Sequence, residues 1–258
     1  MKEETLQKFA ELVERDEAVV RAEISAIMDE ESVSEDTAFG MWKSQNSMSL
    51  RSGKAQEITV RILSRETPKI RNISTGESKV AGIEVIYKDE EGQVGWGYSA
   101  LWGDKADIAT QIAVGEAYKA KARFAYQPTK VKMTDFSILG DANDTEVPTV
   151  QEVAAKWELG TLDRIEDFAG NTELFAGMVS KLIQSTDGVD AVIGFEMSTD
   201  DSMPITVWGG RGRDNPPVPE VQAVLNALNR GDNVLTYAYV FQKDDGSVSL
   251  NAGGVFGA

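Results

Sequence analysis

The order of strand and helix patterns constrains the fold most strongly, because the same order occurs twice in this chain of 258 residues. In each copy, five runs rich in β-branched and aromatic residues predict strands, and an apolar period of three to four residues predicts a helix after the third strand. The first copy has strands at 58–64, 80–87, 94–102, 118–126 and 132–139 with the helix at 104–114; the second has strands at 174–184, 191–197, 204–208, 233–242 and 247–251 with the helix at 220–228. This is the order of the OB-fold, a five-stranded, partly open barrel.

Two short signatures align the copies. Trp102-Gly103 and Trp208-Gly209 end the third strand, whereas Gly115-Glu116 and Gly231-Asp232 precede the fourth. The interval between the signatures is ten residues longer in the second copy, and loops absorb such insertions at little cost. We therefore expect a mainly β protein with two tandem OB-fold five-stranded barrels.

The remaining segments predict a small helical module and two linkers. Apolar residues recur at helical spacing over 5–30, and Ser34 followed by acidic residues predicts the start of another helix. The expected organisation is a helical module at 1–45, a linker at 46–55, OB-fold 1 at 56–140, a linker with a short helical pattern at 141–160, and OB-fold 2 at 161–258.

Charge is distributed unevenly along the chain. The formal net charge is -16, which taken alone argues against binding to nucleic acid. Residues 56–140, however, carry 12 basic and 11 acidic side chains, whereas 1–55 and 141–258 have net charges of -5 and -12. This gradient favours a local polyanion site on the first barrel, although the acidic ends also fit a simple solubilising role.

The chain contains neither cysteine nor histidine, which excludes disulfides, thiolate nucleophiles, histidine acid/base chemistry and Cys/His zinc sites. No phosphate-binding glycine loop is present, and we interpret Asp200-Asp201 and Asp244-Asp245 as turn residues rather than metal ligands. We therefore expect no enzyme activity, no cofactor and no metal. The absence of a long apolar run and of a secretory signal predicts a cytoplasmic protein with no membrane contact.

The segment Leu101-Trp102-Gly103-Asp104-Lys105-Ala106 resembles a motif of the archaeal replication protein A family of single-stranded DNA-binding proteins. The helical segment 5–45 is similar to a module that precedes the OB-folds of some members. The resemblance implies a role in DNA replication, repair and recombination, with Trp102 stacking on a base. The second copy departs from the motif after Trp208-Gly209, where Gly210-Arg211-Gly212 follows.

Single strands are bound by aromatic faces that stack on bases and by cations that follow the phosphates. Alternation along the third strand places Trp96, Tyr98 and Trp102 on one face, which is either the barrel core or the surface that meets bases. The candidate nucleic-acid-binding residues are Arg61, Arg65, Lys69, Arg71, Trp96, Tyr98, Trp102, Lys121, Arg123, Tyr126 and Lys130 in the first copy, and Trp208, Arg211, Arg213 and Phe241 in the second.

Two other functions remain open at this point. In the first, the chain is an OB-fold protein-interaction subunit, and the acidic helical module and OB-fold 2 contact replication or repair proteins without direct DNA binding. In the second, the tryptophans belong to a carbohydrate-binding or hydrolase barrel, but no pair of carboxylates stands out to support it. The expected partner is single-stranded DNA, with replication or repair proteins as possible further partners.

Overall fold

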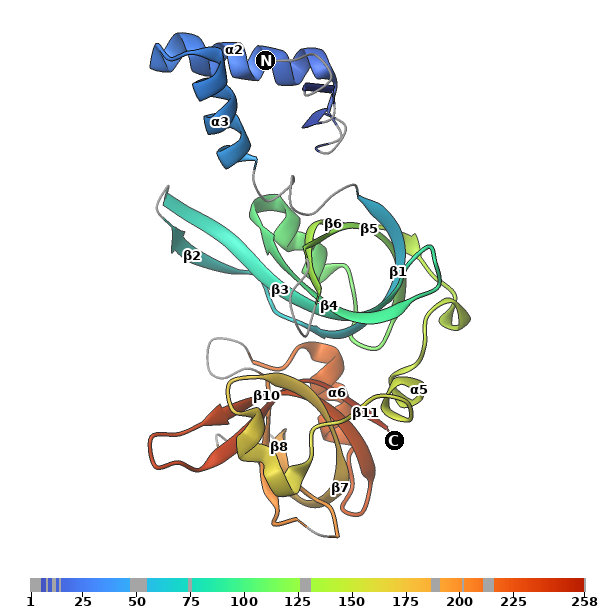
Figure 1. Ribbon diagram of the computed structural model, residues 1–258. Helices are drawn as coiled ribbons and strands as arrows, with labels where there is room; N and C mark the ends of the chain where they lie inside the picture. Colours follow the sequence, from blue (N-terminus) through green and yellow to red (C-terminus); the bar gives the residue numbers. More distant parts are fainter. Residues whose placement is uncertain are drawn as a thin grey trace.

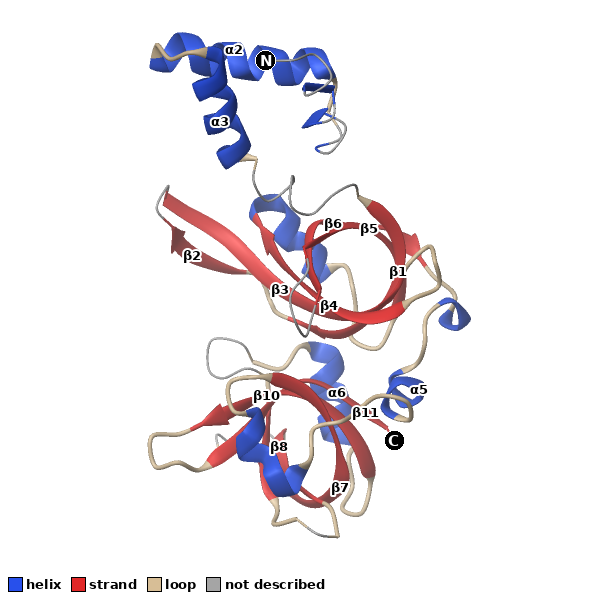
Figure 2. Cartoon of the chain, in the orientation of Figure 1, coloured by secondary structure: helices blue, strands red, loops and turns tan. Residues whose placement is uncertain are grey.

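The computed structural model describes residues 6–7, 9–10, 13, 15–46, 55–73, 76–125, 131–186, 191–200, 202–210 and 216–257. Figure 1 shows a helical unit at the N-terminal end, followed by two β-barrels stacked one below the other. Figure 2 shows that strands dominate both barrels and that short helices lie beside them. The protein is therefore mainly β, as predicted.

The upper barrel is built from the first set of strands. Its elements are β1 (Gln56–Arg65), β2 (Lys69–Ile73), β3 (Gly76–Lys88), β4 (Val94–Trp102), the 3-10 segment η1 (Gly103–Thr110), β5 (Ala117–Ala125) and β6 (Val131–Asp141). The strand order is β1-β5-β6-β4-β3-β2, and β1 also pairs with β3 and closes the ring. The pairing of β4 with β6 is parallel, whereas the other pairings are antiparallel.

The lower barrel repeats this topology. Its elements are η3 (Leu162–Phe168), β7 (Thr172–Gln184), β8 (Val192–Ser198), β9 (Ile205–Gly209), α6 (Pro219–Ala227), β10 (Asn233–Gln242) and β11 (Val248–Gly257). The strands close in the order β10-β11-β9-β8-β7, with β9 parallel to β11. Both barrels therefore have the OB-fold strand order, in which the third and fifth strands pair in parallel.

The N-terminal unit has its own apolar core. Helices α2 (Glu17–Glu31) and α3 (Glu35–Gln45) pack with the described residues of the preceding segment around Leu6, Ile24, Phe39 and Trp42. The described residues of the segment 5–30 are mainly helical, as expected, and α2 begins after Asp16, whose carboxylate accepts a hydrogen bond from the Ala18 N–H (2.7 Å). A side chain that caps a helix start in this way ends the preceding turn.

Two local predictions needed correction. The segment 104–114, expected as a single helix, is helical over a shorter range, the 3-10 segment η1 (Gly103–Thr110). The segment after β1, expected as a loop, contains β2, which forms a hairpin with β3. The signal was present in the sequence, because Ile70 and Ile73 are β-branched and a glycine follows at Gly76.

The segment expected as a linker at 141–160 is packed rather than extended. It contains η2 (Asp144–Glu146) and α5 (Val150–Ala154), and Thr149 forms a reciprocal capping box with Glu152. A single hydrophobic cluster joins this segment to both barrels; its buried members are Leu63, Ile86 and Ala117 of the upper barrel, Val147, Val150 and Val153 of the segment, and Leu174, Leu235 and Tyr237 of the lower barrel. The two barrels therefore share a core.

Candidate nucleic-acid interface

Strand β4 separates two kinds of side chain, as its alternation predicted. Gly97, Ser99 and Leu101 are buried and point into the barrel, whereas Ala100 and Trp102 are exposed on the outer face. The close packing of the inner face explains the small residues, because a Cβ at Gly97 would collide with the side chain of Met133. The aromatic residues of β4 are therefore on the outside of the barrel.

The three outward aromatics meet different surroundings. Trp96 packs against Trp157 (ring centroids 4.9 Å apart) and Tyr237 (5.9 Å) in the cluster between the barrels. Its indole N–H is buried and finds no hydrogen-bond partner among the residues that the structure describes. This corrects the expectation that Trp96 contacts bases, because protein side chains already cover its ring.

Trp102 lies at the opposite end of β4, and 46% of its surface is exposed. It pairs across the sheet with Val80 on β3. Tyr98 is half-buried between them along the strand, opposite Glu84 on β3 and beside Lys132 on β6. Lys132 was not among the predicted site residues, although its alternation with the buried Met133 places it on the same outer face.

The β2–β3 hairpin supplies the exposed basic and apolar groups of this side of the chain. Ile70 and Ile73 are among the most exposed large apolar residues, and Arg71 is exposed between them. Lys69 lies at the base of the hairpin, 3.8 Å from the carboxylate of Glu66. Figure 1 shows the hairpin projecting beyond the wall of the upper barrel.

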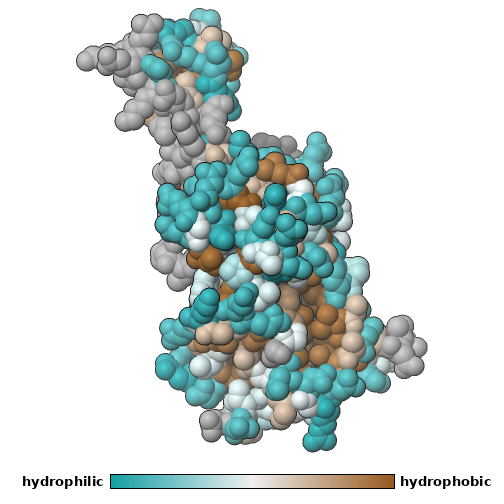
Figure 3. Space-filling model, turned by 90° about the vertical axis from the view of Figure 1, so that its right-hand side faces the viewer, coloured by the Kyte–Doolittle hydropathy of each residue, from teal (hydrophilic) through white to brown (hydrophobic). Residues whose placement is uncertain are grey.

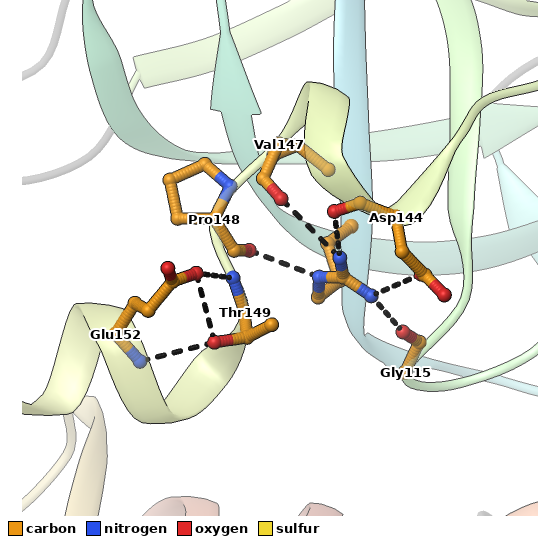
Figure 4. Close-up of polar contacts among 7 residues, drawn as sticks. Gly115, Asp144, Val147, Pro148, Thr149 and Glu152 are labelled. Atoms are coloured by element: carbon orange, nitrogen blue, oxygen red, sulfur yellow. Dashed lines mark hydrogen bonds and ion pairs between the residues drawn. The ribbon is translucent and has the colours of Figure 1, made fainter.

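Arg61 is a structural residue rather than a phosphate contact. It is 5% exposed, and all five of its N–H donors are used. Figure 4 shows the acceptors around the guanidinium, which are the carbonyl oxygens of Gly115, Asp144, Val147 and Pro148 and the carboxylate of Asp144, at 2.7 to 3.2 Å. The prediction for Arg61 is corrected for this reason: no donor is left for DNA.

Arg65 and Arg123 are also engaged by the protein. Arg65 forms a bidentate ion pair with Glu220 of the lower barrel (2.8 and 2.7 Å) and donates to the Ala109 carbonyl (3.0 Å). Arg123 is buried, pairs with Asp135 (3.0 Å) and donates to the Val13 carbonyl of the N-terminal unit. The predictions that Arg65 and Arg123 contact DNA are corrected, because both guanidinium groups are shielded from solvent and donate hydrogen bonds to acceptors within the protein.

The basic stripe on β5 exists, but it faces other parts of the chain. Lys119, Lys121 and Arg123 share the outer face, since the alternating Ala120, Ala122 and Phe124 fill the barrel core. Lys119 lies 3.7 Å from Glu146, and Arg123 is covered as described above. Lys121 is half-buried between them. Other parts of the chain therefore already engage Lys119 and Arg123.

The second barrel brings fewer of the predicted residues together. Trp208 is half-buried and lies over Gly194 of the neighbouring strand, whereas Phe241 is 45% exposed near the end of β10. Hydrogen bonds from the Ser247 hydroxyl and N–H lower the pKa of Asp245, which supports its interpretation as a turn residue. Tyr126, Lys130, Arg211 and Arg213 lie outside the described residues.

In the part of the chain that the structure describes, no group of three or more acidic side chains is placed to hold a metal ion. None of the described helices combines the length and the hydropathy that a membrane span requires. Figure 3 shows the broadest hydrophobic surface of this side on the lower barrel, with smaller hydrophobic patches on the upper barrel among hydrophilic surface.

The strand order of the two barrels defines a protein with two tandem OB-folds. No family model matches the chain, and no curated protein matches it. Among solved structures, the chain is similar to a replication protein A heterotrimer bound to ssDNA (TM-score 0.41, 11% identity, 78% of this chain and 50% of that chain). The chain thus spans half the length of that structure's chain.

Two further similarities are of the same kind. One is to p202 HIN1 in complex with 12-mer dsDNA (TM-score 0.37, 12% identity, 80% of this chain and 94% of that chain). The other is to the wild-type single-stranded DNA binding protein from Thermus aquaticus (TM-score 0.25, 13% identity, 80% and 93%). Since these scores are low, the OB-fold assignment rests on the strand order of the two barrels.

Proposed function

We propose that this chain binds single-stranded DNA through the outer face of its first OB-fold, with Trp102 as the stacking residue. The observation that carries the proposal is the exposure of Trp102, whose ring no other described aromatic packs against. Exposure of a large aromatic ring to water is unfavourable, because its apolar surface must be hydrated. A nucleic-acid base can stack on such a ring, because every base has a flat π-face.

The surroundings of Trp102 supply the second requirement, which is positive charge for the phosphates. Arg71 on the hairpin and Lys132 on β6 lie on this barrel, whose segment 56–140 has a net charge of +1, whereas 1–55 and 141–258 are negative. These cations replace Arg61, Arg65 and Arg123 in the proposed site. Tyr98, between Trp102 and the shared core, would mark the inner end of the bound strand.

The second OB-fold has a lesser part in this proposal. Residues 161–258 carry 6 basic and 14 acidic side chains, a net charge of -8, and Trp208 is already half-buried against Gly194. Phe241 remains as an exposed aromatic there. The wider role that we propose, protection of single strands in replication, repair and recombination, is supported by the resemblance of residues 101–106 to the archaeal replication protein A motif.

The test is a fluorescence titration of the full chain with labelled oligo-dT, with duplex DNA of the same length as the comparison. Trp102→Ala should weaken binding by about 1 to 3 kcal/mol, which is roughly 5- to 150-fold, because one stacked base is lost. Phe241→Ala is the matched control, since it removes an aromatic of almost the same exposure from the other barrel. Its effect should be smaller than that of Trp102→Ala.

The salt dependence adds an independent measurement. Arg71→Ala should flatten the slope of log affinity against log salt by about one unit, whereas Trp102→Ala should leave the slope unchanged, because stacking releases no counterion. Equal affinity for duplex and single strand, or no binding to either at low salt, would refute the proposal. No binding would instead favour the OB-fold protein-interaction subunit.

A further inference from the structure

The base of the β2–β3 hairpin is attached to the lower barrel. Arg65, the last residue of β1, lies four residues before β2 begins, and its guanidinium donates hydrogen bonds to both carboxylate oxygens of Glu220. Its remaining contact, to the Ala109 carbonyl, belongs to the upper barrel. One side chain therefore links the end of β1, η1 and the first turn of α6.

Glu220 is held in this position by further contacts of its own. It is the second residue of α6, and its carboxylate also accepts a hydrogen bond from the N–H of Val114 (3.2 Å). Burial alone would raise the pKa of Glu220, but the hydrogen bonds and charge of Arg65 together with backbone N–H groups lower it overall. The carboxylate is therefore ionised and fully engaged at neutral pH.

The segment between Arg65 and β2 also contacts its surroundings. The carboxylate of Glu66 accepts a hydrogen bond from the N–H of Gly82 (3.3 Å) and lies near the ammonium group of Lys69. Arg65 and Glu66 line one side of a narrow pocket whose other side is formed by the lower barrel, including Pro217, Val218 and Gly253. The hairpin base is thus enclosed between the barrels.

Beyond its base, the hairpin has one further attachment among the described residues, the ion pair of Lys79 with Asp107 of η1 (2.8 Å). Among the described strands, β2 pairs with β3 alone, and it lies at the edge of the sheet. The direction of the hairpin is therefore set by the strand pairing, by the Lys79–Asp107 ion pair and by the contacts at Arg65 and Glu66. A small change at the base is amplified along a projecting hairpin.

We propose that the second OB-fold braces the first: the Glu220–Arg65 pair fixes the β2–β3 hairpin in the position from which it contacts the bound strand, so that both are positioning residues for DNA binding. The role of the hairpin in binding rests on the proposed function. The brace itself is a property of the free protein and is tested separately.

The first experiment measures backbone hydrogen exchange in the full chain without DNA. Glu220→Ala should accelerate exchange severalfold in 69–73 and in the part of β3 that pairs with it, and leave β7 and β8 unchanged. Glu220→Gln, which keeps an oxygen acceptor for Arg65, should show a smaller acceleration. The matched control is Glu196→Ala, which removes the Lys181 ion pair (3.2 Å) within the lower barrel and should leave the hairpin unaffected.

The second experiment measures oligo-dT affinity of the same variants. Removing an acidic residue from a chain of net charge -16 should by long-range electrostatics strengthen DNA binding. The brace predicts the opposite sign for Glu220→Ala, a loss of between about twofold and thirtyfold with the salt slope unchanged. Glu196→Ala should give the electrostatic gain or no change.

The outcomes separate the two proposals. Unchanged hairpin exchange in Glu220→Ala would overturn the brace, whatever the DNA result. Faster exchange together with unchanged or tighter DNA binding would overturn the positioning role. Failure of the parent chain to bind DNA would refute the proposed function and the positioning role, while the exchange measurement would still decide whether the second barrel holds the hairpin.

Discussion

Replacement of Arg61 by methionine tests whether its guanidinium acts inside the protein or on DNA. Methionine retains most of the aliphatic length of arginine and removes all five donors. The phosphate-contact prediction and the structure give opposite results for this variant. A phosphate contact would change the salt dependence of DNA binding and leave the thermal stability almost unaltered; a buried clamp would change stability first.

The magnitude follows from the acceptors. The ion pair with Asp144 contributes little, about 0 to 1 kcal/mol, because 80% of that carboxylate is exposed to water. Most of the lost stability comes from four hydrogen bonds that the charged guanidinium donates to backbone carbonyls in a largely buried site. Each such bond, considered alone, contributes about 1.5 to 3 kcal/mol. These bonds are not additive, so we expect a total loss of about 3 to 5 kcal/mol.

Urea denaturation of the full chain, followed by far-ultraviolet circular dichroism, measures this loss as a shift in midpoint. Asp144→Asn is the matched control, because it removes only the exposed ion pair, and it should cost less than about 1 kcal/mol. A loss below about 1 kcal/mol in Arg61→Met would refute the clamp. A flattened salt slope in a variant of parental stability would restore Arg61 to the DNA site.

Three other perturbations test the shared core and the brace. Trp96→Phe should be close to neutral, because it removes a buried N–H without a partner, whereas Trp96→Ala should cost about 3 kcal/mol in the same urea assay. Gly254→Ala should lower the melting temperature, since a Cβ there meets the Leu63 carbonyl oxygen of the other barrel; unchanged melting would contradict this packing. Because the pKa of Glu220 is lowered by folding, its ionised form contributes stability above the ordinary value of 4.5 and loses it as the pH falls below that range, so the difference between parent and Glu220→Gln should disappear in acid. A difference that does not shrink as the pH falls from 7 into the acid range would show that the charge is not its source.

The sequence by itself determined the architecture, since local patterns were enough to place the strands. Strand β4 was predicted with its observed bounds, and its alternation correctly separated Gly97, Ser99 and Leu101 from the aromatic face. The repeated order with a helical segment after the third strand also led to the OB-fold. These features depend on the period of two along a strand and on the strand preferences of residue types. Both can be recognised from residues that are close together in the sequence.

Only the tertiary structure decided what covers each outward side chain. Trp96 and Trp102 have the same residue type, strand and face, yet the second barrel and α5 cover one and leave the other exposed. In the sequence, Arg61 and Arg65 look like Arg71, but their hydrogen-bond acceptors come from residues 44 to 155 positions away in the chain. A periodic pattern tells which face a residue is on; whether that face meets solvent depends on the docking of distant elements, which leaves no local trace in the sequence.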